Sequence, residues 1–217
     1  MMQYEKDTFT HFHGFSGVTL TPCDDNEAYN DVTEHNNAVT FLYAGCIYGP
    51  RRIDTLLTGF EKYHKKHPQT QLLFVGKLYN TDFAGYEHLL NSGVIERHNF
   101  TTDISAYYRK ADVLIDLNAD IKNDVFLSSK VCNYLSYNKP ILTISQDGSP
   151  VRAMFRGVES IVHSHHNAEE IFTAMEKTAA MIGQPISDRK ELQHPFLPDE
   201  VAKKFCHDLE ELINHND

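Results

Sequence analysis

Two features of the sequence predict an α/β fold, with a mostly parallel sheet of about six strands and helices on both faces. Short apolar runs alternate with segments in which apolar residues recur every three or four positions. Strands that alternate with helices in this way form parallel sheets, because each helix returns the chain to the start of the next strand. The runs are also apolar throughout, which is typical of strands that are buried on both faces.

The first half of the pattern predicts three strands and two helices. The run AVTFLYAG ends at Gly45, and a segment with apolar residues at i, i+3, i+4 and i+7 follows from Ile53 to Phe60. The second strand, QLLFVG, ends at Gly76, and YEHLLNSG predicts a short helix that stops at Gly93. The third expected strand is VIERHNF.

The second half predicts three more strands. DISAYYRKA is typical of a helix and DVLIDLN of the fourth strand, and a helix that begins near Ser129 precedes the fifth strand, PILTIS. Ser149 and Pro150 open the next helix, since proline is tolerated at a first helical position, where its missing N–H costs nothing. SIVHS is the sixth strand, and two amphipathic segments predict the last helices, at residues 171–179 and 201–213.

Residues 1–37 do not follow this alternation. They are polar and rich in Asn and Asp, and GVTL is their one apolar patch. We expect a connector or the remnant of another unit there, with a covering edge strand as the alternative. Residues 38–217 are expected to form a three-layer domain.

The composition argues against several classes of protein. The 217 residues carry a formal net charge of -10, whereas nucleic-acid-binding proteins usually have a positive footprint. No apolar run approaches the roughly 20 residues that span a bilayer, and the start lacks the apolar region of a signal peptide. The cysteines are scattered without a CxxC pair, which predicts thiols in a reducing compartment and hence a cytoplasmic location. They are Cys23, Cys46, Cys132 and Cys206.

The chain has 13 histidines, and His163, His165 and His166 form the densest group. A metal site is one interpretation, but no HExxH motif or cysteine partner accompanies them. A strand that runs out into a solvated loop is the simpler interpretation. We therefore expect no metal site.

Cations follow several of the predicted strands. Ligands of open α/β sheets bind beyond the carboxyl ends of the strands, where Arg51, Lys77 and Lys130 are expected. Ser128 and Ser129 stand beside Lys130 at a helix start, where backbone N–H groups can donate to an anion. The sequence thus predicts a phosphate site. The alternative is that one serine is an ordinary helix cap and Lys130 a surface lysine.

Several segments resemble, in order and spacing, the C-terminal domain of GT-B-fold glycosyltransferases, of the group 1 or family-4-like set. The resemblance covers roughly residues 38–213, and the ordered set carries it, because no single motif is specific. The segments are FLYAGCIYGPRRIDTLLTGF, LLFVG, DISAYYRKADVLIDL, SSKVCNYLSYNKPILTI, DGSPVRAMFRGVESIV and PDEVAKKFCHDLEELI.

The resemblance implies a Rossmann-like domain that holds a nucleotide-sugar donor without a metal or other cofactor. The acceptor would bind mainly to an N-terminal Rossmann-like domain, for which this chain has no room. Residues 1–37 resemble the lead-in from that domain. Any membrane contact would be peripheral and made through it, and the products implied are bacterial-type polysaccharides or cell-surface glycans.

The resemblance also assigns roles to residues around the diphosphate and sugar. The family's diphosphate-binding basic pair falls on Cys46 and Arg51, so its first member is absent here. Of its two glutamates, the one that holds the ribose falls on Asn133. The sugar-proximal one falls on Val125, beside which Asp124 could serve.

The remaining assignments concern the other strand-end loops. Ser128, Ser129, Lys130 and Lys77 would join Arg51 at the diphosphate, and several family branches carry an SK…Y version of this helix that Ser129, Lys130 and Tyr134 match. The base would lie near the loop after the third strand, bordered by His98, Phe100 and Thr101.

The expected function is the donor-binding half of a glycosyltransferase, inactive by itself, with its catalytic residues unassigned. The alternative is a non-catalytic interaction module that has lost donor chemistry, which the losses at Cys46 and Val125 favour. A single-domain receiver is disfavoured because FLYAGCIYG has no acidic cluster. Nucleotide titration separates the first two hypotheses.

Overall fold

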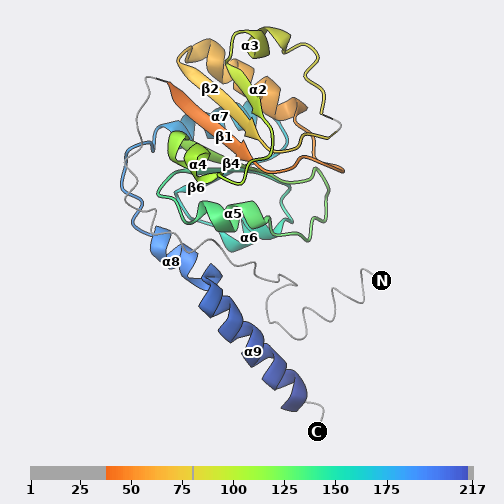
Figure 1. The fold of residues 1–217 in the computed structure, drawn as a ribbon, viewed down its shortest axis with the longest axis vertical. Helices are drawn as coiled ribbons and strands as arrows, with labels where there is room; N and C mark the ends of the chain where they lie inside the picture. The colour runs from red at the N-terminus through yellow and green to blue at the C-terminus, as the bar shows by residue number, and fades with distance from the viewer. Residues whose placement is uncertain (1–37, 80, 215–217) are drawn as a thin grey trace.

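The computed structural model describes residues 38–79 and 81–214, and these residues form a six-stranded sheet with helices on both sides (Figure 1). Every neighbouring pair of strands is parallel, in the order β3-β2-β1-β4-β5-β6. This confirms the predicted fold class. The strands are β1 Val39–Ala44, β2 Thr70–Val75, β3 Ile95–His98, β4 Val113–Leu117, β5 Ile141–Ile144 and β6 Ile161–Ser164.

The helices fall into two groups, one on each face of the sheet. α2 and α7 pack together over one apolar cluster, and α4, α5 and α6 contribute to the other. Each predicted helix is present. The bounds are α2 Asp54–Lys66, α3 Glu87–Asn91, α4 Ser105–Lys110, α5 Ser129–Tyr134, α6 Pro150–Met154, α7 Ala168–Ala179 and α9 Pro198–Asn214.

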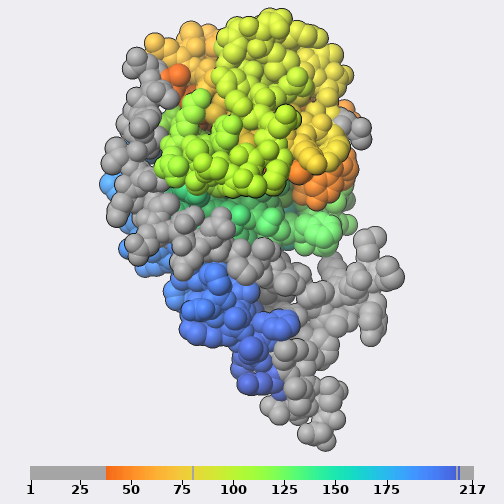
Figure 2. All heavy atoms as spheres, viewed as in Figure 1, coloured from red at the N-terminus to blue at the C-terminus, as the bar shows by residue number. Residues whose placement is uncertain are grey.

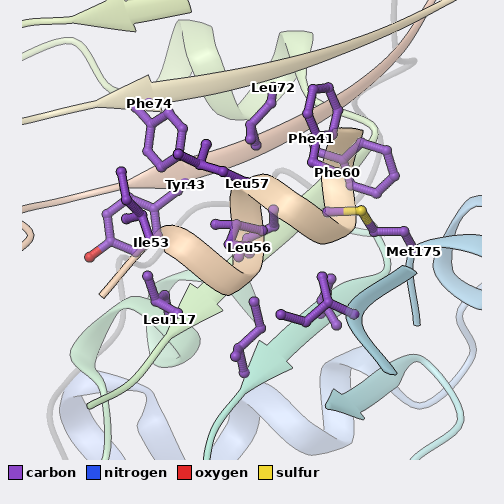
Figure 3. Close-up of a cluster of buried hydrophobic side chains, with 14 of the residues drawn as sticks. Phe41, Tyr43, Ile53, Leu56, Leu57, Phe60, Leu72, Phe74, Leu117 and Met175 are labelled. Carbon is purple, nitrogen blue, oxygen red and sulfur yellow. The ribbon is translucent and has the colours of Figure 1, made fainter. Parts of the chain in front are cut away.

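Side chains of β1 alternate between the two faces, as the pleat of a strand requires. Phe41 and Tyr43 belong to the cluster under α2 and α7, whereas Leu42 and Ala44 belong to the cluster under α5. Figure 3 shows the first cluster, in which Phe60 and neighbouring residues of α2 interleave with the sheet. A strand with both faces buried in this way is mostly apolar.

The strand order places a topological switch point between β1 and β4. From β1 the chain builds outward to β2 and β3, then returns to the other side of β1 for β4, β5 and β6. The loops after β1 and β4 consequently diverge to opposite sides and leave a crevice at the carboxyl edge, where ligands of such sheets bind.

Two short elements near the C-terminus were not predicted from the sequence: α8, Arg189–Gln193, and the 3₁₀ turn η2, His194–Phe196. Arg189 is 1% exposed and donates from Nη2 to the Lys139 carbonyl at 2.8 Å. Together these elements fasten the chain to the sheet body before α9 leads away from it (Figures 1 and 2).

No helix of the described ranges is both long enough and apolar enough to cross a membrane. The expectations for residues 1–37 lie outside the described residues.

Candidate functional site

Two glycines let the ends of β1 and β2 approach closely. Gly45 and Gly76 have φ values of 136° and 134°, which residues with a side chain rarely adopt. A Cβ on Gly76 would collide with the Gly45 carbonyl, and a Cβ on Gly45 would collide with Cε of Lys130. The side chain of Lys130 therefore passes directly over the end of β1.

Lys130 extends from the start of α5 into the crevice between β1 and β4. Its Nζ lies 5.4 Å from the centroid of the Tyr43 ring, within the range of a cation–π interaction. The Tyr43 hydroxyl donates to the Cys46 carbonyl at 3.0 Å, which orients the ring. Lys130 is thus a half-buried cation at the switch point, not a surface lysine.

Arg51 brings a second cation to the same crevice from the loop between β1 and α2. Its guanidinium carbon lies 4.9 Å from the centroid of the Tyr48 ring, and its buried Nε has no hydrogen-bond partner among the described residues. Burial lowers the pKa of Lys130, Asp116 opposes that shift, and the positive charge of Arg51 adds to it. Two cations that repel each other in a crevice are suited to an anionic ligand.

Asp116 is an acid at this site that the sequence reading missed. It lies within β4, fully buried, and Oδ2 accepts from Asn118 Nδ2 at 2.8 Å. Its Oδ1 has no hydrogen-bond partner within the described ranges. The one available signal was an aspartate inside the otherwise apolar run VLIDL.

The two serines at the start of α5 differ in role. Ser128 is the N-cap: its Oγ accepts from the Lys130 backbone N–H at 3.3 Å, and it is 7% exposed. This is the ordinary cap of the alternative interpretation. Ser129 is the first helical residue and is exposed, so its hydroxyl is accessible from solvent.

A concave site of about 430 Å³ lies at the carboxyl ends of β2 and β3. It contains Lys77 and His98, and His98 Nε2 lies 2.9 Å from Glu96 Oε2. The bridge between Ile47 and Leu78 joins this site to the loop that carries Arg51. The lining residues are Gly76, Lys77, Leu78, Tyr79, Arg97, His98 and Asn99.

The other predicted site residues differ in their exposure and in their hydrogen-bond partners. Phe100 is 66% exposed, whereas the Thr101 hydroxyl accepts from the Asp103 N–H in its own loop at 3.1 Å. Asn133 is half-buried on α5. Asp124 is 4% exposed and accepts from the Phe126 N–H at 3.0 Å, so its carboxylate turns into its own loop.

Exposed apolar side chains gather on the loops around the crevice. In the described residues, every large apolar side chain that is exposed lies on a loop after β1, β2, β3 or β4, except Phe205 on α9. These side chains are Tyr48, Tyr79, Phe100, Ile121, Val125 and Phe126.

The three clustered histidines have separate surroundings. His163 Nδ1 contacts Thr143 Oγ1 at 2.6 Å. His165 lies between Asp147 and Glu170, at 2.8 and 2.7 Å. Within residues 38–79 and 81–214, no group of three or more His, Cys, Asp or Glu side chains is placed to hold a metal ion.

No protein-family model matches the sequence, and no curated protein matches it. Solved structures do match its fold. The lipopolysaccharide outer core galactosyltransferase WaaB matches with a TM-score of 0.66 and 13% identity, over 89% of this chain and 55% of that one. A glycosyltransferase from Rickettsia africae matches with a TM-score of 0.62 and 14% identity, over 82% and 49%.

HepE from Anabaena, solved in complex with UDP, matches with a TM-score of 0.62 and 10% identity, over 81% of this chain and 49% of that one. The chain therefore spans about half the length of these structures. At such low identity the likeness establishes the fold alone, which is that of the C-terminal half of the GT-B architecture, as the resemblance implied.

Proposed function

We propose that this chain is the nucleotide-sugar-binding half of a glycosyltransferase, with the donor diphosphate held at the carboxyl ends of β1 and β4. The observation that carries the proposal is the convergence of Arg51 and Lys130 at the switch point of this fold. Such crevices are where α/β sheets bind their ligands.

The chemistry follows from the two charges. When the bond between sugar and diphosphate breaks, negative charge develops on the departing phosphate oxygen. Fixed cations in a crevice stabilise that charge without having to reorganise. In this proposal Arg51 and Lys130 neutralise the diphosphate, with Lys77 and the accessible Ser129 hydroxyl at its edge, and no metal is required.

The nucleoside would extend toward β3. The concave site of about 430 Å³ beside Lys77 and His98 has room for it, and the exposed ring of Phe100 offers a stacking surface for a base. Asn133 would contact the ribose. Asp124 would approach the sugar only after its loop releases the carboxylate from the Phe126 N–H.

Transfer to an acceptor would need a second domain, in the same chain or in a partner. Two observations support this part of the proposal: the matched structures are about twice as long, and the apolar side chains around the crevice are exposed. The acceptor class would be a polysaccharide or cell-surface glycan. The scattered thiols favour a cytoplasmic location.

A non-catalytic interaction module is the second candidate. Position 46 is a cysteine and position 125 a valine where the family has charged residues, and exposed apolar loops suit a protein interface. A module of this kind would have no affinity for nucleotides.

Calorimetry with a series of nucleoside diphosphates tests the choice. We expect weak binding that survives EDTA, and Arg51→Ala should weaken it about tenfold to hundredfold by removing a charge-assisted contact. Lys65→Ala is the control, because Lys65 is exposed at the far end of α2 and pairs with Glu61 at 3.2 Å. No binding at millimolar nucleotide, or an unchanged affinity in Arg51→Ala, would favour the interaction module.

A further inference from the structure

The carboxylate of Asp116 is an unusual group to find in the middle of a parallel sheet. It is fully buried, Asn118 donates to only one of its oxygens, and the described residues offer the other no hydrogen-bond partner. A buried carboxylate is costly unless a cation or several donors compensate it. The question is which group in the crevice provides that compensation.

The geometry of α5 brings Lys130 toward Asp116. The Tyr134 hydroxyl donates to the Ile115 carbonyl at 3.1 Å and accepts from the Ala44 N–H at 3.2 Å, so this side of α5 covers the seam between β1 and β4. Lys130 precedes Tyr134 by four residues and therefore lies on the same side of the helix.

The strand register places Asp116 at the same point of the seam. The β1–β4 pairing ends at Leu42 and Leu114, and beyond it the Tyr134 hydroxyl bridges the Ala44 N–H and the Ile115 carbonyl, so Ala44 and Asp116 lie across the opening seam from each other. The next residue, Gly45, is the one against which Cε of Lys130 packs. The Lys130 side chain and the Asp116 carboxylate thus lie at the same end of the seam, where the carboxylate acts on the ammonium through its charge and not through a direct contact.

The remaining charged and titratable groups around Lys130 come from β1 and the loop after it. They are Cys46, Tyr48 and Arg51, and the ring of Tyr43 lies beneath the ammonium. Arg51 and burial both favour the neutral amine, whereas Asp116 is the strongest of the groups that favour the ammonium.

We propose that Asp116 is a positioning residue of the diphosphate site, which holds the ammonium of Lys130 in place and charged so that Lys130 replaces the cation that position 46 lacks. This inference rests on the proposed function for the identity of the ligand. The effect of Asp116 on Lys130 does not depend on a ligand and is tested in the unliganded chain.

The proposed role of Asp116 predicts that the affinity for the diphosphate falls as the pH rises. Lys130 attracts phosphate only when it is protonated, so affinity is highest below the pKa of Lys130 and falls as the pH rises through it. Without the carboxylate, the largest of the effects that oppose burial and Arg51 is lost, and the fall begins at lower pH. Lys130→Arg should remove the dependence, because a guanidinium stays charged throughout.

The first test is an NMR titration of Lys130 Cε in the unliganded chain. The midpoint should lie at lower pH in Asp116→Asn than in the parent, and equal midpoints would overturn the proposal. Should Asp116→Asn not fold, Asp116→Ser gives a second measurement of the same midpoint. That midpoint should also lie at lower pH than in the parent, and an unchanged midpoint would equally overturn the proposal.

The second test measures UDP affinity between about pH 7.5 and 10, where the terminal phosphate, whose pKa is near 6, is already ionised. All variants carry Cys46→Ser, so that the comparison does not involve a thiol beside Lys130. The affinity of Asp116→Asn should fall relative to that of the parent as the pH rises across this range, because each unit by which the pKa of Lys130 is lowered reduces the charged fraction by up to tenfold.

Adding Lys130→Arg to Asp116→Asn should give an affinity that no longer falls with pH, which loss of fold would not allow. If the parent binds no UDP, the proposed function fails while the NMR titration still decides the pairing. If the parent binds UDP and Asp116→Asn has the same pH profile, the role of Asp116 is refuted and the proposed function stands.

Discussion

The core beneath α2 and α7 differs from the carboxyl rim of the same sheet. The difference lies in which side chains are buried and in whether buried polar atoms have hydrogen-bond partners. In the core, apolar residues such as Phe60 and Leu57 are fully buried, and the polar groups above them pair between the helices, as Lys66 does with Glu176 at 3.1 Å. At the rim the situation is reversed: aromatic side chains such as Phe126 are exposed, while polar atoms are buried without partners.

Most buried polar side-chain atoms that lack a hydrogen-bond partner within the described ranges lie at this rim. They belong to Arg51, Thr55, Asp116, Ser145, Ser149, Arg152 and His166. Folded proteins normally pair such groups, so their concentration at one edge calls for an explanation. The same sheet is thus locally consistent on its faces and incomplete at its carboxyl edge, as expected of an edge that receives a ligand or a partner.

Two phenylalanines should show the largest difference in the loss of stability on substitution by alanine. Phe60→Ala should lower the free energy of unfolding by about 3–5 kcal/mol, because it opens a cavity in the core under α2. Phe126→Ala, at a residue that is 69% exposed, should change it by less than about 0.5 kcal/mol. Chemical denaturation of both variants measures the difference. Equal costs would mean that the rim is packed in the isolated chain and the comparison is false.

Two glycines of the loop after β1 should show a smaller difference in stability, together with a difference in UDP affinity. Gly45→Ala should cost about 1–3 kcal/mol, because its φ of 136° is strained for alanine and the new Cβ displaces Lys130. It should also weaken UDP binding about tenfold, since a charged hydrogen bond is worth about 1.5–3 kcal/mol.

Gly49→Ala is the matched control for that variant. Gly49 also has a positive φ, of 62°, but a Cβ there meets no atom within 4 Å. We expect a cost of about 1 kcal/mol and an unchanged affinity. If both variants lose affinity alike, loop strain and not the position of Lys130 governs the site.

The smallest expected effect concerns His165 at the other end of the rim. Hydrogen bonds to Asp147 and Glu170 raise the pKa of His165 in the folded chain. A raised pKa contributes stability that is fully present below the unfolded value near 6.5 and is lost as the pH rises through the folded pKa.

His165→Gln should therefore lower Tm at pH 6, by less than about 2 °C because the group is partly exposed, and have no effect at pH 9. Thermal unfolding across this range measures it, and Asp147→Asn should reduce the pH 6 effect. A Tm difference that grows with pH would contradict the assignment.

The secondary-structure elements and the fold class could be predicted from the sequence. Each of the six strands and each predicted helix is present, and the parallel arrangement follows from their alternation. These features could be predicted because the spacing of apolar residues is visible within a short stretch of sequence. A strand buried on both faces gives a continuous apolar run, and an amphipathic helix gives apolar residues every three or four positions. Arg51 and Lys130 could be singled out for a related reason, since the ends of predicted strands locate the rim.

Which groups share the rim follows from the tertiary structure. The strand order put β4 beside β1, so that Asp116 lies on the side of the sheet covered by α5 and its charge acts on Lys130, 14 residues away in sequence. It also distinguished Ser128, a helix cap, from Lys130, and it buried Arg189 against the Lys139 carbonyl through α8. These contacts depend on which distant surfaces exclude water from one another, and no local repeat records that choice.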